Sequence, residues 1–143
     1  MAAPLVTRMV NANEELSSRA FEGSAAASLN EIEAVQRKLS FTLPTSYVTF
    51  MCTGNGGEGF IGKSYLVLWK VEELTSMNAA YHVAEFVPGL FLFGSNGGGE
   101  AYGFDTRSRP PTIVSVPFIA MDLADAKIVA SDFETFLSEL SAP

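Results

Sequence analysis

LFLFGSNGGGEAYGFD, residues 90–105, is the stretch that decides the fold class. Two β-prone segments, LFLFGS and AYGFD, flank the glycine-rich turn NGGGE. Asn-Gly is a strong hairpin signal because a type I′ turn needs positive φ at both of its central residues. We therefore expect Asn96 and Gly97 to form a type I′ turn that joins two antiparallel strands.

Two helices are expected before this hairpin. Ser28 and Glu31 have the spacing of a capping box, which satisfies free N–H groups where a helix begins. The next helix lies in LPTSYVTFMCTG, where Pro44 suits the first helical position and Tyr47 lies on the apolar face. Gly54 is the expected end of this helix because glycine readily takes positive φ.

The other segments complete an alternation typical of an α+β fold. YLVLW (65–69) and TIVSVPFIAM (112–121) are β-prone, while VEELTSMNAAY (71–81) has helical spacing but no good N-cap at Lys70. Ser131 and Glu134 form a second capping box before a closing helix. Helices followed by hairpin-linked strands predict one domain with a mostly antiparallel sheet and helices packed against it.

The 143 residues are enough for one domain, which we expect to span residues 28–143. Residues 1–27 are rich in Ala, Ser and Asn and form an N-terminal extension, in which NANEELSSR can make one or two helical turns. The chain contains neither an apolar run of membrane-spanning length nor the apolar stretch of a secretory signal. A cytoplasmic protein is therefore expected.

The negative charge is concentrated in the second half of the sequence. Residues 1–71 hold six acidic and six basic residues, whereas residues 72–143 hold ten acidic and three basic ones, a balance of −7. Such a surface repels nucleic acid and favours a basic protein partner. The alternative, that acidity only keeps the protein soluble, remains open.

GEGFIGKS (57–64) fits the phosphate-loop pattern G-x-x-x-x-G-K-[ST]. A phosphate loop follows a strand and begins a helix, so that N–H groups and the helix dipole face the phosphates. Here a predicted helix precedes the motif and a predicted strand follows it. A nucleotide hydrolase is therefore only a distant alternative.

The sequence contains few other candidates for catalytic or metal-binding residues. His82 is the only histidine, Cys52 is the only cysteine, and no Cys/His cluster has metal-ligand spacing, so neither a cofactor nor a metal is expected. Glu100 and Asp105 bracket one predicted strand as possible paired carboxylates. Their odd separation places them on opposite faces of that strand, which argues against a catalytic pair.

Taken in order, the motifs from Ser28 to Leu140 resemble the SUKH superfamily, which includes the Smi/Knr cell-wall-assembly regulators and many bacterial immunity proteins. The most specific pieces are LPTSYVTF followed by NGGEG, and FGSNGGGEAYGFD. The resemblance implies a non-catalytic α+β domain. The positions that match the family's motifs are structural: Pro44, Tyr47, Asn55, Gly56, Gly57, Trp69, Gly94, Asn96, Gly97 and Gly99.

The resemblance also implies a protein partner. Bacterial members bind and neutralise a cognate toxin, often a nuclease, whereas eukaryotic relatives are regulatory scaffolds, and this alternative remains open. A nuclease needs a basic groove for phosphates, so an acidic surface can block it. Tyr102 is the first candidate for an aromatic anchor. The candidate acidic contacts outside the expected helices are Glu85, Glu100, Asp105, Asp122 and Asp125.

Overall fold

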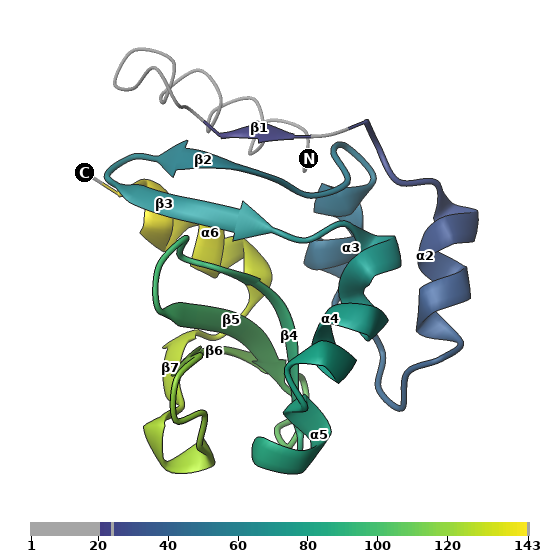
Figure 1. The fold of residues 1–143 in the computed structure, drawn as a ribbon. Helices are drawn as coiled ribbons and strands as arrows, with labels where there is room; N and C mark the ends of the chain where they lie inside the picture. Colours follow the sequence, from purple (N-terminus) through teal and green to yellow (C-terminus); the bar gives the residue numbers. More distant parts are fainter. Residues whose placement is uncertain (1–20, 24, 143) are drawn as a thin grey trace.

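The computed structural model describes residues 21–23 and 25–142. In this part of the chain, one antiparallel sheet contains seven strands whose spatial order is their order in the sequence (Figure 1). The predicted α+β fold, with an antiparallel sheet and helices packed on it, is thereby confirmed. The strands are β1 (Glu22–Gly23), β2 (Gly57–Ile61), β3 (Ser64–Leu68), β4 (Leu90–Ser95), β5 (Glu100–Asp105), β6 (Thr112–Pro117) and β7 (Lys127–Ala130).

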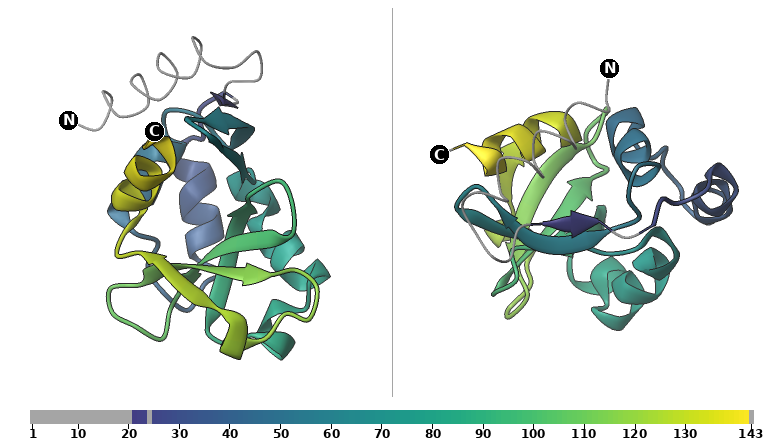
Figure 2. Two further views of the ribbon diagram at one scale, coloured as in Figure 1. Left: turned by 90° about the vertical axis from the view of Figure 1, so that its left-hand side faces the viewer. Right: turned by 90° about the horizontal axis from the view of Figure 1, so that it is seen from above.

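Helices lie on both faces of the strands β4–β6. Figure 2 shows α6 on one side of these strands and α4 and α5 on the other. The pairing register agrees, since Phe104 and Ile113 share one face while Gly103 and Val114 share the other, and all four are buried. The helices are α2 (Leu29–Gln36), α3 (Thr45–Met51), α4 (Leu74–Ala80), α5 (Val83–Phe86) and α6 (Phe133–Ser141), with 3₁₀ turns η1 (Val71–Glu73) and η2 (Leu123–Asp125).

A cluster of aromatic rings joins α3, the sheet and α6. The ring of Tyr47 lies edge-on to Phe104, with centroids 5.3 Å apart, and to Phe133 at 5.1 Å. Phe93 contacts both Phe104 and Phe136, at 4.8 and 5.7 Å. Aromatic pairs of this kind add stabilisation beyond the area that they bury. Tyr47 is thus a central core residue, in keeping with the structural position expected for it.

The first predicted capping box is confirmed and the second is wrong. Ser28 Oγ accepts from Glu31 N–H at 3.1 Å, and Glu31 Oε1 accepts from Ser28 N–H at 2.9 Å. The last helix is capped one residue later than expected, because Asp132 Oδ1 accepts from Thr135 N–H at 2.7 Å. Asp and Ser are comparable N-caps, so their order in the sequence does not decide between them.

The hairpin between β4 and β5 is confirmed, but its type I′ turn is wrong. Residues 96–99 connect the strands, and only Gly97 in this connection has positive φ, 79°. Asn96 instead uses its side chain, whose Oδ1 accepts from Gly98 N–H at 2.8 Å and from Glu100 N–H at 3.2 Å. A longer loop held by an asparagine side chain thereby replaces the two-residue turn.

Two further local predictions need correction. The helix α3 begins at Thr45, with Pro44 as its N-cap, and ends at Met51; positive φ then occurs at Gly56 (79°) rather than at Gly54. The predicted strand 112–121 ends at Pro117, which has no N–H to donate on the side of β7.

The predicted helix 71–81 is divided into η1 and α4, and the poor N-cap at Lys70 is compensated locally. The carboxylate of Glu73 accepts from Lys70 N–H at 3.1 Å. The side chain of Asn55, two residues before β2, accepts from Val71 N–H and donates to Glu72 Oε1, both at 2.8 Å. The Asn55 position therefore fixes where this helical segment begins.

The sheet begins before the expected domain boundary at residue 28. Strand β1 pairs with β2, and the buried ring of Phe21 lies 6.3 Å from that of Phe50. The division into an extension and a domain stays a prediction. The short helix expected from Asn13 lies outside the described residues.

Candidate partner-binding surface

One face of the hairpin β2–β3 carries half-buried apolar side chains. The register pairs Phe60 with Tyr65 and Glu58 with Val67, so all four point to the same side. The alternate residue Leu66 is fully buried on the other side, whereas Phe60, Tyr65 and Val67 keep part of their surface accessible. In Figure 1, α6 lies behind this hairpin.

This surface continues into a stack of three rings from distant segments. Trp69, after β3, lies parallel to Tyr81, after α4, with centroids 6.1 Å apart and planes 8° apart. Tyr81 in turn contacts Phe118, after β6, at 4.8 Å. Tyr81 is 37% exposed, whereas Trp69 is 8% exposed and anchors the stack in the core. We name the combined surface of Phe60, Tyr65, Val67, Trp69, Tyr81 and Phe118 the aromatic face.

The glycine loop 97–99 borders the aromatic face. A Cβ on Gly97 would lie 2.5 Å from Cδ2 of Tyr65, and its φ of 79° also disfavours a side chain. The carbonyl oxygen of Gly99 accepts a hydrogen bond from Phe118 N–H at 2.9 Å, which holds the loop beside the ring stack. All three loop glycines are exposed, so a partner can approach their backbone closely. The hydroxyl of Tyr65 donates to Glu58 Oε2 at 2.6 Å, which orients this ring.

Three of the predicted acidic contacts lie at the same end of the sheet as this loop. Glu100 begins β5 opposite Pro117, and the connection that follows Pro117 carries the exposed residues Asp122 and Asp125. Asp122 caps η2, since its Oδ1 accepts from Ala124 N–H at 2.8 Å. Glu85 is elsewhere: it is exposed on α5, with Oε1 3.9 Å from His82 Nδ1.

Asp105 and Tyr102 have mainly structural contacts. The carboxylate of Asp105 is buried at the other end of β5 and binds the Arg107 guanidinium through two hydrogen bonds of 2.9 Å. These bonds lower the pKa of Asp105. The half-buried ring of Tyr102 packs on Phe136 of α6 at 4.8 Å, and burial followed by the charge of Glu100 raises its pKa. Tyr102 therefore faces α6, on the opposite side of the sheet from the aromatic face.

Glu100 and Asp105 do not form a catalytic pair. Their partners across the β5–β6 ladder are Pro117 and Thr112, and the odd spacing puts the two carboxylates on opposite faces, as expected. His82 offers no catalytic pair either, since 64% of its side chain is exposed and its ionisable neighbour is the equally exposed Glu85. The described residues contain no group of three or more His, Cys, Asp and Glu that could hold a metal ion.

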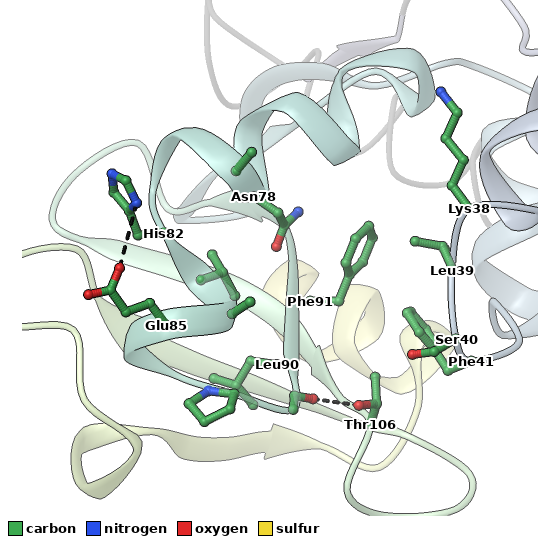
Figure 3. A pocket seen from close by; sticks show the side chains of 15 residues that line it. Lys38, Leu39, Ser40, Phe41, Asn78, His82, Glu85, Leu90, Phe91 and Thr106 are labelled. Atoms are coloured by element: carbon green, nitrogen blue, oxygen red, sulfur yellow. Dashed lines mark hydrogen bonds and ion pairs between the residues drawn. The ribbon is translucent and has the colours of Figure 1, made fainter.

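A pocket of about 590 Å³ lies between the α2–α3 connection and the helices α4 and α5 (Figure 3). Its walls include Leu39, Phe41 and Phe91, while Lys38 and His82 stand at its rim. His82 has a φ of 54°, an uncommon conformation for a residue with a side chain. The pocket has an apolar interior, and its ionisable pair, His82 with Glu85, is exposed at the rim.

GEGFIGKS does not have the geometry of a phosphate loop. Gly57–Ile61 is the strand β2, and Gly62 and the exposed Lys63 turn the chain into β3. The expectation that no helix follows Lys63 is confirmed. Phosphates near Lys63 would therefore meet no helix N-terminus.

The aromatic face was not identified from the sequence, although a signal for it was present. In YLVLW, Tyr65, Val67 and Trp69 alternate with Leu66 and Leu68, which indicates a strand with two apolar faces. Tyr81 and Phe118 join the face only through the tertiary structure, because they lie 37 positions apart in the sequence.

The sequential antiparallel sheet, with helices on both faces and an open aromatic surface, defines the class as a single-sheet α+β domain. The chain belongs to the SMI1 / KNR4 family (SUKH-1), whose model matches residues 26–139. No curated protein matches this chain in sequence. Among the described residues, no helix is both long and apolar enough to span a bilayer.

Proposed function

We propose that this protein is a non-catalytic immunity protein that neutralises a cognate toxin by binding it. Membership of the SMI1 / KNR4 family supports a binding role. The observation that carries the proposal is the aromatic face, where Tyr81 is held between two rings and remains 37% exposed. Aromatic residues fixed in this way supply most of the energy of many protein interfaces, because they bury large areas at little entropic cost.

The acidic residues around this face suit a basic toxin surface, such as the phosphate-binding groove of a nuclease. Glu100, Asp122 and Asp125 lie at the end of the sheet where the glycine loop and Phe118 meet. Charge complementarity mainly accelerates encounter and excludes wrong partners, while buried rings supply affinity. Tyr81 is therefore proposed as the central anchor, with the acidic residues at the rim.

The test is binding of the toxin domain encoded by the neighbouring gene, measured by calorimetry and by rescue of cells that express the toxin. Tyr81→Ala should weaken binding by about 2 kcal/mol and reduce rescue. Phe86→Ala is the matched control, since Phe86 is 51% exposed but lies on α5 and contacts His82, outside the aromatic face. Equal effects of the two substitutions would contradict the proposed anchor.

Which protein binds to this chain distinguishes the immunity function from the regulatory-scaffold alternative. Neutralisation of the neighbouring toxin by the wild-type protein supports the immunity function. Binding to endogenous proteins without any protection from that toxin would support the regulatory-scaffold alternative instead.

A further inference from the structure

Strand β7 is the last strand of the sheet within the described residues, and it exposes two apolar side chains. Ile128 is 70% exposed and Val129 is 37% exposed. Proteins usually protect such edges with charged residues, prolines or a covering segment, since a free edge can pair with another chain. Lys127 is the only charged residue in this strand.

The direction of the backbone groups of β7 follows from the ladder beside it. Phe118 N–H donates to the Gly99 carbonyl oxygen, so even-numbered residues of β6 bond to β5 and odd-numbered residues bond to β7. Ser115 faces Lys127, which therefore directs its backbone groups towards β6. Val114 faces Ile128 in a pair without mutual hydrogen bonds, so the N–H and C=O of Ile128 point outward.

Carboxylates flank this edge at both ends. Asp122 and Asp125 precede β7, Asp132 follows it, and all three are exposed. The hydrogen bond from Thr135 N–H lowers the pKa of Asp132, which keeps this residue ionised. Because Ile128 directs its backbone groups outward, a second copy would pair antiparallel with Ile128 opposite Ile128. Asp125 would then lie opposite Ser131 and beside Asp132 of the other copy, and like charges this close repel.

We propose that β7 binds an extended, basic segment of a partner protein as an additional strand. The outward N–H and C=O of Ile128 would pair with the backbone of that segment, as in other cases of strand addition. An apolar side chain of the segment would cover Ile128, and Lys or Arg residues at its two ends would face Asp125 and Asp132. This site shares Asp125 with the proposed acidic rim of the aromatic face, but it relies on the backbone of β7 and does not depend on the proposed toxin.

The probe is a fluorescein-labelled nonapeptide of alternating Arg and Val, compared with one of alternating Glu and Val. Fluorescence anisotropy at physiological salt should show saturable binding of the Arg peptide only. Ile128→Pro removes the outward donor but no ladder bond, and should weaken binding about tenfold. Ile128→Thr keeps the donor and is the matched control, expected to weaken binding only about twofold to threefold.

Hydrogen exchange on the unmodified chain is a second measurement. It tests strand addition at β7 even if Ile128→Pro fails to fold. The Ile128 amide should exchange rapidly in the free protein and become protected by the Arg peptide, while Lys127 is protected in both states. Tyr81→Ala should leave peptide binding unchanged. Absence of Arg-peptide binding, equal binding of the Glu peptide, equal affinities of the Pro and Thr variants, or an Ile128 amide that stays unprotected would each overturn the proposal.

Discussion

The side-chain amide of Asn78 forms two hydrogen bonds with the backbone of Leu92: Nδ2 donates to the carbonyl oxygen at 2.9 Å, and Oδ1 accepts from the N–H at 2.8 Å. The ladder between β3 and β4 contains only the pairs Val67–Ser95 and Leu68–Gly94. Beyond these pairs, Asn78 of α4 satisfies the backbone groups of β4 that a neighbouring strand would otherwise bind. The side chain of Asn78 thus continues the hydrogen bonding of the sheet beyond β3 and links β4 to helix α4.

Replacing Asn78 with alanine should destabilise the protein by about 3 kcal/mol, because both backbone groups of Leu92 lose their partners. Urea unfolding followed by circular dichroism measures this change. Ser76→Ala, on the exposed side of the same helix, should cost about 0.5 kcal/mol or less. Similar losses for the two variants would show that Asn78 does not replace a strand.

Glycine is required sterically at position 94. A Cβ there would lie 2.1 Å from the carbonyl oxygen of Val67, and this backbone atom cannot move without separating β3 from β4. Gly94→Ala should therefore cost about 2 kcal/mol or more. Gly99→Ala should be neutral or stabilising by up to about 1 kcal/mol, since nothing lies within 4 Å of the position that its Cβ would occupy. Melting temperatures of the two variants test this contrast.

The partly buried ion pair of Asp105 and Arg107 should contribute stability that depends on pH. Hydrogen bonds from Arg107 lower the pKa of Asp105 in the folded state. This contribution is therefore complete above the unfolded pKa of about 4 and is lost as the pH falls through the lower folded pKa. Asp105→Asn should be less stable than the wild type at pH 7, and the difference should shrink towards about pH 2. A difference independent of pH would assign the loss to packing alone.

The hydroxyl of Tyr47 is buried and has no hydrogen-bond partner among the described residues. Burial raises the pKa of Tyr47 well above its ordinary value, so the ring stays neutral in the folded protein. Tyr47→Phe should leave the melting temperature unchanged or raise it, because an unpaired polar group no longer has to be buried. Tyr47→Ala should cost about 4 kcal/mol by removing the central ring. A clear loss of stability in Tyr47→Phe would indicate that the hydroxyl is hydrogen-bonded in solution.

Charge reversal should change the rate of toxin binding more than its affinity. Glu100→Lys combined with Asp122→Lys should lower the association rate about tenfold at low salt and flatten its dependence on ionic strength. Stopped-flow measurements across a salt series, with circular dichroism as the control for folding, provide the test. A wild-type rate that does not vary with salt would mean that the acidic residues serve solubility alone.

The sequence predicted elements whose signals are local, and it missed arrangements that depend on distant contacts. Ser28 with Glu31 identified a helix start because the interaction spans one turn. The strand β7, with only four residues, and the strand β2 were not predicted, since β7 is very short and glycines dilute the pattern of β2. The acidic half was recognised from composition, but composition could not show that Asp105 is neutralised by Arg107 while Asp122 remains exposed.

In the candidate site, too, the arrangements that depend on contacts between distant segments were not predicted. Trp69 was expected to be a structural position and is nearly buried, yet its stacking partner Tyr81 comes from a helix end that the sequence does not relate to β3. Tyr102 was chosen because a tyrosine ring can pack while its hydroxyl stays in water, but strand pleating turns this ring towards Phe136. Which side of a strand faces a helix is fixed only when the layers assemble.

The neighbour-to-neighbour order of the strands determines how the molecule responds to pulling. A force applied to the C-terminal end would detach α6 and then peel β7 from β6, loading a few hydrogen bonds at a time rather than a whole ladder at once. Each later hairpin would open in the same zipper-like manner. At the junction of β3 and β4, two residue pairs and the hydrogen bond from Trp69 N–H to the Phe93 carbonyl oxygen resist, while the amide of Asn78 holds β4 to α4. A protein unfolded in this way offers little mechanical resistance, so a motor protease that engages its C-terminal end could extract the chain strand by strand.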